Sequence, residues 1–263
     1  MTLADVRALY DRHQRLETSD PNVRLITSDR TVRLLAPSIQ RGVVIHSRLT
    51  AADADVVIAA EVAFFQSQPM ITSLEWKVFD YDAPADLLER LHAQGFISEP
   101  ADAICVLELA TMPDRLRQPI THNIRQITDP TALEDVIAVQ AAVWGADNEW
   151  ISNGWLRATL TDSLTSAPDS IGVYVAYVDG MPACSAWIDY GTTSPFSGLW
   201  GGSTVEAYRG RGLYTDMLAI RAQTALARGV GYLTIDASPM SRAIVEKQGF
   251  EFMAYAWECS LEW

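Results

Sequence analysis

The chain has 263 residues, enough for one large domain or two of ordinary size. Apolar residues make up 49% of it and charged residues 20%, a composition that fits a folded globular protein and excludes a disordered one. The formal net charge of −13 argues against nucleic acid as a partner, because an acidic surface repels phosphate backbones. No apolar run approaches the ~20 residues that cross a bilayer, and the N-terminus lacks a signal-peptide pattern, so we expect a cytoplasmic protein with no membrane partner.

The three cysteines, Cys105, Cys184 and Cys259, lie far apart in the sequence. An odd number without close spacing argues against a disulfide framework and against a zinc site. We therefore expect buried thiols in a reducing compartment, and no metal.

The first half of the chain gives two clear elements. Its residue pattern predicts a strand over Leu74–Asp80 and a helix over Ala85–Gln94 that ends at Gly95. This half has no glycine- and arginine-rich loop, so we expect it to bind no cofactor of its own.

A polar stretch with two prolines, Thr111–Asn123, has neither helical nor strand periodicity and is predicted to be a linker. It divides the chain into residues 1–118 and 119–263, each of plausible domain size.

The second half begins with a short predicted strand, Ile124–Ile127. A capping box of Thr131 and Glu134 is expected to open the next helix, which ends at Gly145. A second helix is expected within Trp150–Leu164.

A hairpin follows, because the β-rich stretches Ile171–Val178 and Met181–Tyr190 flank Asp179–Gly180, a strong two-residue turn signal. The remaining predicted elements are a strand (Leu199–Val205), a helix (Gly210–Arg228), a strand (Tyr232–Ala237), a short helix (Ser241–Gln248) and a closing strand (Phe250–Leu261). The resulting order, β-α-α-β-β-β-α-β-α-β, predicts an α/β fold with a mixed sheet and helices on both faces.

Two segments share a pattern of a short helix, Gly-Phe and a β-rich stretch: Leu87–Ala110 and Ala243–Trp263. Either an ancient duplication or the common ending of a helix at glycine explains the pattern, and both explanations stay open.

The segment Ser203–Tyr214 (STVEAYRGRGLY) carries the most specific chemical signal. Gly210 and Gly212 lie between a predicted strand and a predicted helix, where successive backbone N–H groups can form an anion-binding concavity. Four of the eight basic residues after the linker fall within twenty positions, and Arg209 and Arg211 are two of them. The pattern predicts a phosphate or pyrophosphate site, although the chain has neither a P-loop nor a dinucleotide fingerprint.

RGRG at Arg209–Gly212, after a strand and before a helix, resembles the coenzyme A signature Q/R-x-x-G-x-G/A of the GCN5-related N-acetyltransferases (GNATs). The segment Ser238–Phe250 (SPMSRAIVEKQGF) is similar to that superfamily's later short-helix motif, which ends in Gly-Phe. The order of elements over 124–261 also fits, so the resemblance covers about 140 residues. It implies a GNAT acyltransferase fold with two GNAT-like lobes: a catalytic domain over 119–263 and, before it, a degenerate GNAT-like half over 1–118.

The resemblance also implies a binding mode for acetyl-CoA. The backbone of Arg211–Tyr214 would hold the pyrophosphate, and the end of the preceding strand would pair with the pantetheine arm and orient the thioester carbonyl. The cofactor-binding residues implied in this way are Thr204, Val205, Arg209, Gly210, Arg211, Gly212, Leu213, Tyr214 and Ser238. A neutral amine of a small molecule or peptide would then attack the acetyl group directly.

Several positions depart from the family pattern. The sixth motif position, usually Gly or Ala, is Tyr214, whose ring we expect to pack beside the cofactor. The family's frequent tyrosine acid falls at Val245, and its frequent asparagine falls at Ser238. A carboxylate base that some members carry about six residues before Thr204 falls at Gly198. The acid and the base are therefore both missing from their usual places.

The catalytic residues must then be sought elsewhere. All four histidines precede Asn123, so a histidine base would have to come from the first half, and we expect each to be structural. Asp189, near the end of the hairpin, is our candidate catalytic residue, Glu206 is an alternative, and a water chain is a third. The tryptophans of this half are expected to be mainly core, with one or two lining an acceptor pocket, and Trp144–Trp150 is expected to be a lid.

Three functions stay open at this point. The leading one is an acetyl-CoA-dependent N-acetyltransferase whose partners are acetyl-CoA and an amine. The second is a non-catalytic acyl-CoA-binding or regulatory protein, since the acid and the base are missing. The third is a tandem acyltransferase with a larger donor such as aminoacyl-tRNA, which the acidic surface disfavours. We expect the first half to shape the acceptor side, and a homodimer stays open as the assembly.

Overall fold

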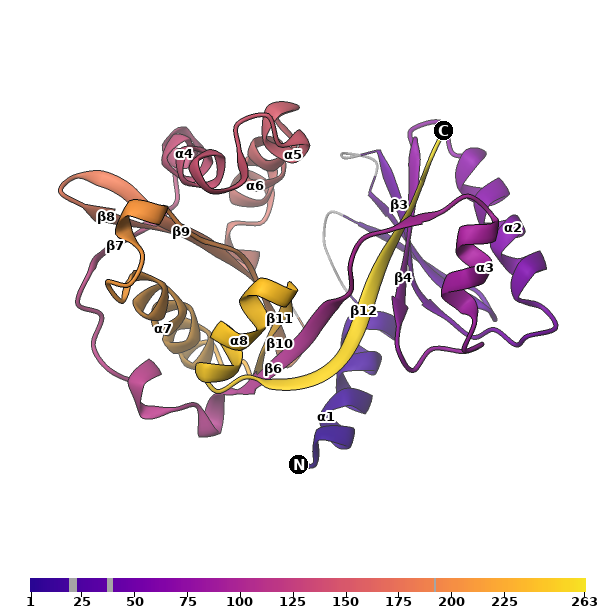
Figure 1. The fold of residues 1–263 in the computed structure, drawn as a ribbon, viewed down its shortest axis with the longest axis horizontal. Helices are drawn as coiled ribbons and strands as arrows, with labels where there is room; N and C mark the ends of the chain where they lie inside the picture. The colour runs from indigo at the N-terminus through magenta and orange to yellow at the C-terminus, as the bar shows by residue number, and fades with distance from the viewer. Residues whose placement is uncertain (19–22, 37–39, 192) are drawn as a thin grey trace. The chain divides into compact units, whose positions relative to one another are not determined.

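The computed structural model describes residues 1–18, 23–36, 40–191 and 193–263. Its internal contacts divide the chain into two compact units, each with strands and helices (Figure 1). Unit 1 comprises Met1–Cys105, Asp236–Val245 and Phe252–Trp263, and unit 2 comprises Val106–Ile235 and Glu246–Glu251. Four elements contain a boundary between the units: β6 (Asp102–Glu108), β11 (Tyr232–Ala237), α8 (Pro239–Lys247) and β12 (Glu251–Glu262).

The C-terminal strand β12 (Glu251–Glu262) lies almost wholly in unit 1. It pairs antiparallel with β4 (Ser73–Phe79), from Ala256 opposite Phe79 to Glu262 opposite Ser73, and it also pairs with β5 (Ile97–Ser98). Each unit is therefore assembled from separate stretches of chain. The domain boundary between residues 118 and 119 differs from this contact division and stays a prediction.

Unit 1 has the strand order β1-β2-β3-β4-β12. Its other elements are α1 (Leu3–Tyr10), a π-helical turn (Asp11–Leu16), β1 (Arg24–Thr27), β2 (Thr31–Ala36), β3 (Arg41–Ser47), α2 (Ala54–Gln66) and α3 (Leu87–Ala93). The crossover through α2 makes β3 and β4 parallel, and a buried apolar core that includes Phe65, Trp76 and Leu91 joins α2 and α3 to the sheet. The predicted strand and helix of this half are confirmed to within two residues at each end.

Unit 2 has the strand order β11-β10-β9-β8-β7, in which only β10 and β11 are parallel. Its elements are β7 (Asn123–Ile127), α4 (Leu133–Trp144), α5 (Glu149–Ser152), α6 (Trp155–Ser166), β8 (Ile171–Val178), β9 (Met181–Tyr190), β10 (Phe196–Thr204) and α7 (Leu213–Ala227). Figure 1 shows α4 and α6 on one face of this sheet and α7 on the other. The predicted α/β fold with a mixed sheet and helices on both faces is confirmed.

The predicted hairpin turn is confirmed, since Asp179 and Gly180 both have the positive φ that such a turn requires, 51° and 81°. The predicted capping box is wrong. The Asp129 carboxylate accepts the Thr131 N–H at 2.9 Å and opens a 3-10 turn before α4, while Glu134 forms an ion pair with Arg157. An aspartate two residues before the N–H caps it locally, which leaves Glu134 available for a longer-range partner.

The helix expected within Trp150–Leu164 is instead two helices, α5 and α6. They are separated at Gly154, whose φ of +77° interrupts the helical backbone.

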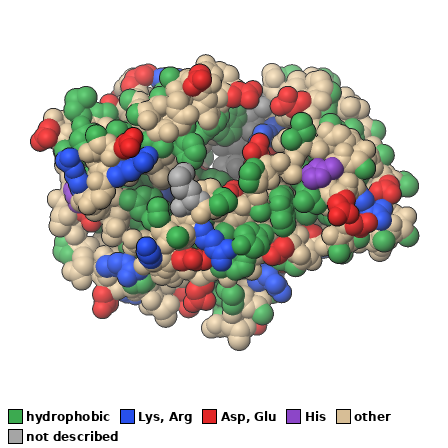
Figure 2. All heavy atoms as spheres, viewed as in Figure 1, with side chains coloured by type: hydrophobic (Ala, Val, Ile, Leu, Met, Phe, Trp, Pro, Cys, Tyr) green, Lys and Arg blue, Asp and Glu red, His purple; other side chains and the backbone are tan. Residues whose placement is uncertain are grey.

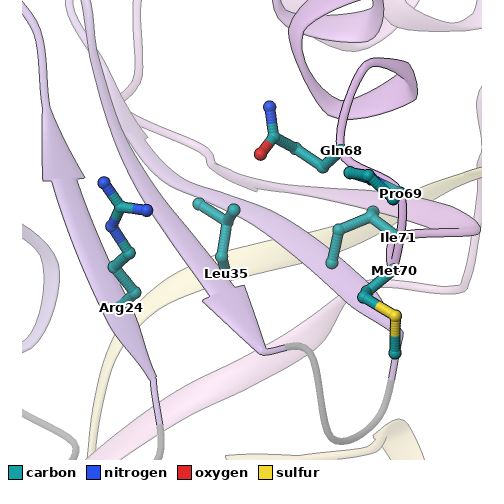
Figure 3. Close-up of a pocket in the computed structure, with 6 residues that line it drawn as sticks. All are labelled: Arg24, Leu35, Gln68, Pro69, Met70 and Ile71. Atoms are coloured by element: carbon teal, nitrogen blue, oxygen red, sulfur yellow. The ribbon is translucent and has the colours of Figure 1, made fainter.

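Two small cavities lie in unit 1. The first has a volume of about 170 Å³, with Arg24 from β1, Leu35 from β2 and Gln68–Ile71 from the turn after α2 around it (Figure 3). The second, about 220 Å³, lies beside Val78 and Trp257. Both are smaller than the roughly 300–1,000 Å³ of typical ligand pockets, and neither includes a predicted site residue.

All three cysteines are buried, as expected. Among the described residues, no helix is long and apolar enough to cross a membrane.

Candidate functional site

The predicted anion loop lies between β10 and α7 in unit 2. Gly210 and Gly212 have φ of +73° and +86°, a conformation that side-chain-bearing residues rarely adopt, and Gly212 is the N-cap of α7. The helix starts at Leu213, three residues later than predicted, so Arg209–Gly212 is an exposed loop leading into a helix N-terminus. Backbone N–H groups of the first helical turn have no intrahelical acceptor and can bind an anion.

The side chains of Arg209 and Arg211 each donate a hydrogen bond to a backbone carbonyl shortly before the loop. Arg209 Nε donates to the Thr204 carbonyl at 3.1 Å, and an Arg211 terminal nitrogen donates to the Ala207 carbonyl at 3.1 Å. Each guanidinium has five N–H donors, so these bonds leave others for a ligand. The loop is therefore held by its own side chains and remains cationic.

The strand before the loop separates from its parallel neighbour. The β10–β11 pairing ends at Gly198 opposite Thr234, while β10 continues to Thr204 with β9 as its partner. Among the described residues, no further register pair joins β10 to β11. The last six residues of β10 therefore have one edge that an extended ligand can pair with.

Polar groups of the two predicted contact residues at this edge, Thr204 and Val205, already form hydrogen bonds within the protein. The Val205 N–H already donates to the Ala183 carbonyl at 3.0 Å, and the Val205 carbonyl accepts from Tyr208 N–H at 2.9 Å. The Thr204 hydroxyl contacts Cys184 Sγ at 3.3 Å. Pairing with a ligand arm thus falls to the edge before Val205.

A β-bulge interrupts that edge. Trp200 lies opposite Trp187 and Ser203 opposite Ser185, so Gly201 and Gly202 together oppose one residue of β9. Gly201 has a φ of +60°, and a Cβ placed there would lie 1.8 Å from the Trp187 ring. The position therefore accepts glycine alone, a constraint that sequence reasoning missed.

Buried polar side chains hold the bulge from the α4 side. Gln140 Nε2 donates to the Gly201 carbonyl at 2.6 Å and lies 2.9 Å from Ser185 Oγ, while its Oε1 accepts from Ser203 Oγ at 3.1 Å. Trp144 Nε1 also donates to Ser203 Oγ, at 3.1 Å. Gln140 is completely buried, so these bonds fix the backbone of the bulge rather than a surface contact.

Asp189, the predicted catalytic residue, is exposed on β9 and lies directly opposite Gly198 in the register. Residues directly opposite each other in an antiparallel pair point to the same face of the sheet. Asp189 therefore lies beside the position where the family pattern puts a carboxylate base. It lies five positions along β9 from Cys184, the partner of Thr204, or ~17 Å along the strand.

His122 is a further residue at the loop that sequence reasoning assigned to structure. A Cβ built on Gly212 would lie 3.4 Å from its Cε1, and its Nδ1 lies 2.7 Å from the carboxylate of Asp216 in the first turns of α7. The same Asp216 oxygen accepts the N–H of Thr121 and of His122. Burial raises the pKa of Asp216, but these hydrogen bonds outweigh it and hold that pKa below its usual value. Only the fold could reveal this pair, because 94 positions separate its members.

The remaining predicted residues lie in different places. Leu213 is buried under the start of α7, and Glu206 is exposed in a 3-10 turn. Ser238 belongs to unit 1, where its hydroxyl lies 3.2 Å from that of Ser241. Val245, which occupies the position of the family's tyrosine acid, is fully buried in unit 1.

The expected lid segment Trp144–Trp150 is the turn from α4 to α5 and the start of α5. Trp144 is 48% exposed, while Trp150 and Trp155 pack against the core formed by α4, α6 and β8. Acidic side chains are spread over the face drawn in Figure 2 rather than gathered in one patch. On this face the acidic side chains therefore mark no single site.

No family model matches the chain, and no curated protein matches it in sequence. Solved structures do match its fold. A GCN5-related N-acetyltransferase from Kribbella flavida superposes with a TM-score of 0.67 at 16% identity, covering 97% of this chain and 94% of that one. The fold is that of the GNATs.

Two other solved structures match along most of both chains. A tandem GNAT protein of the clavulanic acid biosynthesis pathway matches with a TM-score of 0.59 at 16% identity, over 94% of this chain and 85% of that one. A conserved protein of unknown function from Staphylococcus epidermidis ATCC 12228 matches with a TM-score of 0.71 at 15% identity, over 100% and 98%. The two-lobed GNAT architecture expected from the sequence is therefore confirmed, and at these identities the likeness concerns the fold.

Proposed function

We propose that the protein is an acetyl-CoA-dependent N-acetyltransferase that acts on an amine of a small molecule or peptide. One observation carries the proposal: β10 parts from β11 after Gly198 and runs through a glycine bulge into a cationic loop at the N-terminus of α7. An edge that pairs with an extended arm and a loop that binds anions together suit a ligand with a pantetheine arm and a pyrophosphate. GNAT structures that match along nearly the whole chain support the same reading.

In this proposal each part of the site has one task. The N–H groups of Arg211–Tyr214 and the loop arginines hold the pyrophosphate. The bulge at Gly201–Gly202, held by Gln140, presents backbone N–H groups to the thioester carbonyl, where a fixed donor stabilises the developing oxyanion. Asp189 accepts the proton that the attacking amine loses, through a water, since only a neutral amine is nucleophilic.

Calorimetric titration of acetyl-CoA into the wild-type protein and into an Arg209→Ala plus Gly212→Glu variant tests the cofactor site. The wild type is expected to bind with a micromolar Kd, and the double variant is expected to lose binding by at least 30-fold. The physical reason is that the glutamate fills the anion site with negative charge while one cation is removed.

A matched control lies at the other end of α7. The Arg228→Ala plus Gly229→Glu variant makes the same two changes, again at an exposed arginine and at a glycine with positive φ, +80°. It is expected to bind acetyl-CoA like the wild type. Equal loss in both variants would indicate a general effect on α7, and no binding by the wild type would end the acetyltransferase proposal.

The non-catalytic alternative predicts a different pattern. A protein that only binds acyl-CoA would bind acetyl-CoA at the same loop, but no amine would speed the release of CoA. A panel of spermidine, 2-phenylethylamine and a lysine-containing peptide, assayed by thiol release, separates the two functions.

A further inference from the structure

The bulge glycine Gly202 is exposed, and a tyrosine lies against it. A Cβ built on Gly202 would lie 3.2 Å from Tyr214 Cε2 and 3.9 Å from the Tyr214 hydroxyl oxygen. The ring therefore reaches from the first turn of α7 to the edge of β10, beyond the last β10–β11 pair. The family's loop motif usually has Gly or Ala at this position, so the tyrosine hydroxyl is particular to this chain.

A buried cation lies beside the same point. Arg221 is 1% exposed, and one of its terminal nitrogens, Nη2, lies 3.9 Å from the Cβ position of Gly202. Its other nitrogens are used by the backbone: Nε donates to the Met217 carbonyl at 3.0 Å and Nη1 to the Trp187 carbonyl at 3.1 Å. Within the described part of the chain, Nη2 has no hydrogen-bond acceptor.

Arg221 also has no carboxylate partner within the described ranges. Its leading electrostatic neighbours are the phenols of Tyr214, Tyr174 and Tyr190 and the thiol of Cys184. Burial lowers the pKa of Arg221, which means that keeping the guanidinium charged in this position reduces the stability of the folded state. An unpaired buried charge reduces stability, so the side chain is better explained by a negative charge that forms beside it during a reaction.

The protonation state of the Tyr214 hydroxyl suits a proton donor. Burial raises the pKa of Tyr214, and Arg221 partly opposes this effect. The hydroxyl therefore keeps its proton at neutral pH and is available to donate it. Arg221 would stabilise the phenolate once that proton has left.

We propose that Tyr214 donates the proton to the departing thiolate of the acyl donor, with Arg221 as the positioning residue that stabilises the charge behind it. This inference rests on the acetyltransferase function proposed above. It supplies the acid that is missing at Val245.

The proposed step balances. The amine lone pair forms the C–N bond to the carbonyl carbon, the C–S bond breaks, and its electron pair goes to sulfur. Sulfur takes the proton of the Tyr214 hydroxyl, Asp189 accepts the proton lost by the nitrogen, and solvent water then carries a proton from Asp189 back to the tyrosinate. The products are an amide and a free thiol.

Tyr214→Phe tests the hydroxyl alone, since it removes that group and keeps the ring that covers Gly202. Acetyl-CoA binding is measured by calorimetry, and thiol release is measured with acetyl-CoA alone and with the amine panel. Slow hydrolysis of acetyl-CoA expels the same thiolate, so the measurement does not depend on the identity of the amine. We expect kcat to fall by about 100-fold, within the usual range for general acid catalysis, while Kd stays within twofold.

Tyr208→Phe is the matched control. Tyr208 is in the same loop with its ring under Arg211, the ring-to-guanidinium distance being 5.5 Å, and losing its hydroxyl is expected to leave kcat unchanged. Unchanged kcat in Tyr214→Phe would overturn the inference.

Arg221→Met tests the positioning residue by a pH profile. In the wild type, kcat is expected to fall at alkaline pH as Tyr214 ionises. Without the guanidinium, this fall moves to higher pH, because the phenolate loses its stabilising charge. An alkaline limb that stays in place would remove Arg221 from the mechanism, and thermal unfolding checks that the variant folds.

A third variant, Tyr214→Ala, distinguishes a proton donor from a ring that blocks the cofactor. Acetyl-CoA binding by Tyr214→Ala but not by the wild type would make the ring an obstruction and overturn the inference. Binding by neither protein would remove the acetyltransferase proposal and this inference with it.

Discussion

The carboxylate of Asp189 is the residue on which the base of the proposed reaction depends. The sequence made it the candidate catalytic residue because it lies near the end of the second strand of the hairpin, and the β9–β10 register puts it opposite Gly198. We expect Asp189→Asn to lower kcat at least tenfold with acetyl-CoA affinity unchanged, because the amide keeps the shape but cannot accept the proton. Glu206→Gln, measured in the same thiol-release assay, serves as the comparison. Wild-type turnover in Asp189→Asn would remove this residue from the mechanism.

At the scale of elements, the β4–β12 pair contains a buried carboxylate in an acidic setting. Burial and then Glu258 raise the pKa of Glu75 to about 7, although Arg41 lies 2.9 Å from its carboxylate. Lys77 on the same strand forms an ion pair with Asp236 and lies 3.7 Å from Glu258. The charged form of Glu75 is therefore disfavoured in the folded state.

This raised pKa predicts a pH-dependent stability. Below about pH 4.5 Glu75 is protonated in both the folded and unfolded states, and above about pH 7 it is ionised in both. The free energy of unfolding therefore falls as the pH rises through this window, since the unfolded state loses its proton first. Glu75→Gln is expected to raise that free energy by about 1–3 kcal/mol at pH 8 and to change it little at pH 4.

Urea unfolding at the two pH values measures this difference. Glu89→Gln, at an exposed position of α3, is the control and is expected to show the same small change at both. An equal effect of Glu75→Gln at pH 4 and pH 8 would contradict the proposed cause.

At the scale of the whole molecule, the last strand decides what can fold by itself. Unit 1 contains all but the first residue of β12. Residues 256–262 of this strand pair with the whole of β4, and Cys259 is buried in the core of that unit. We therefore expect a fragment of residues 1–118 to lack a cooperative thermal transition. Without β12, β4 would lose a paired strand and the core would lose the side chains that β12 contributes to it. Circular dichroism during heating measures this, with the full chain as the reference.

The complementary fragment tests the role of the first half. A fragment 119–263 that folds and keeps full activity would show that residues 1–118 are not needed for the reaction. That result would refute the expectation that the first half shapes the acceptor side.

Local sequence determined most elements and the anion loop. Three features depend on backbone conformations that the local residues impose, so residue type alone predicts them. They are the turn at Asp179–Gly180, the end of α4 at Gly145 and the Arg/Gly loop before α7. The capping at Thr131 and the split of α5 from α6 were missed because several local signals competed there, and packing and capping contacts selected among them.

Only the tertiary structure could decide the chemistry around the loop. The bulge at Gly201–Gly202, the support from Gln140, the position of His122 near Gly212 and that of Arg221 near Gly202 all bring together residues that are not neighbours in the sequence. Their positions follow from strand register and from the packing of α4 and α7 on the sheet. Local sequence patterns contain neither kind of information. The same holds for β12, whose place in unit 1 is fixed by pairing with residues 177 to 189 positions earlier.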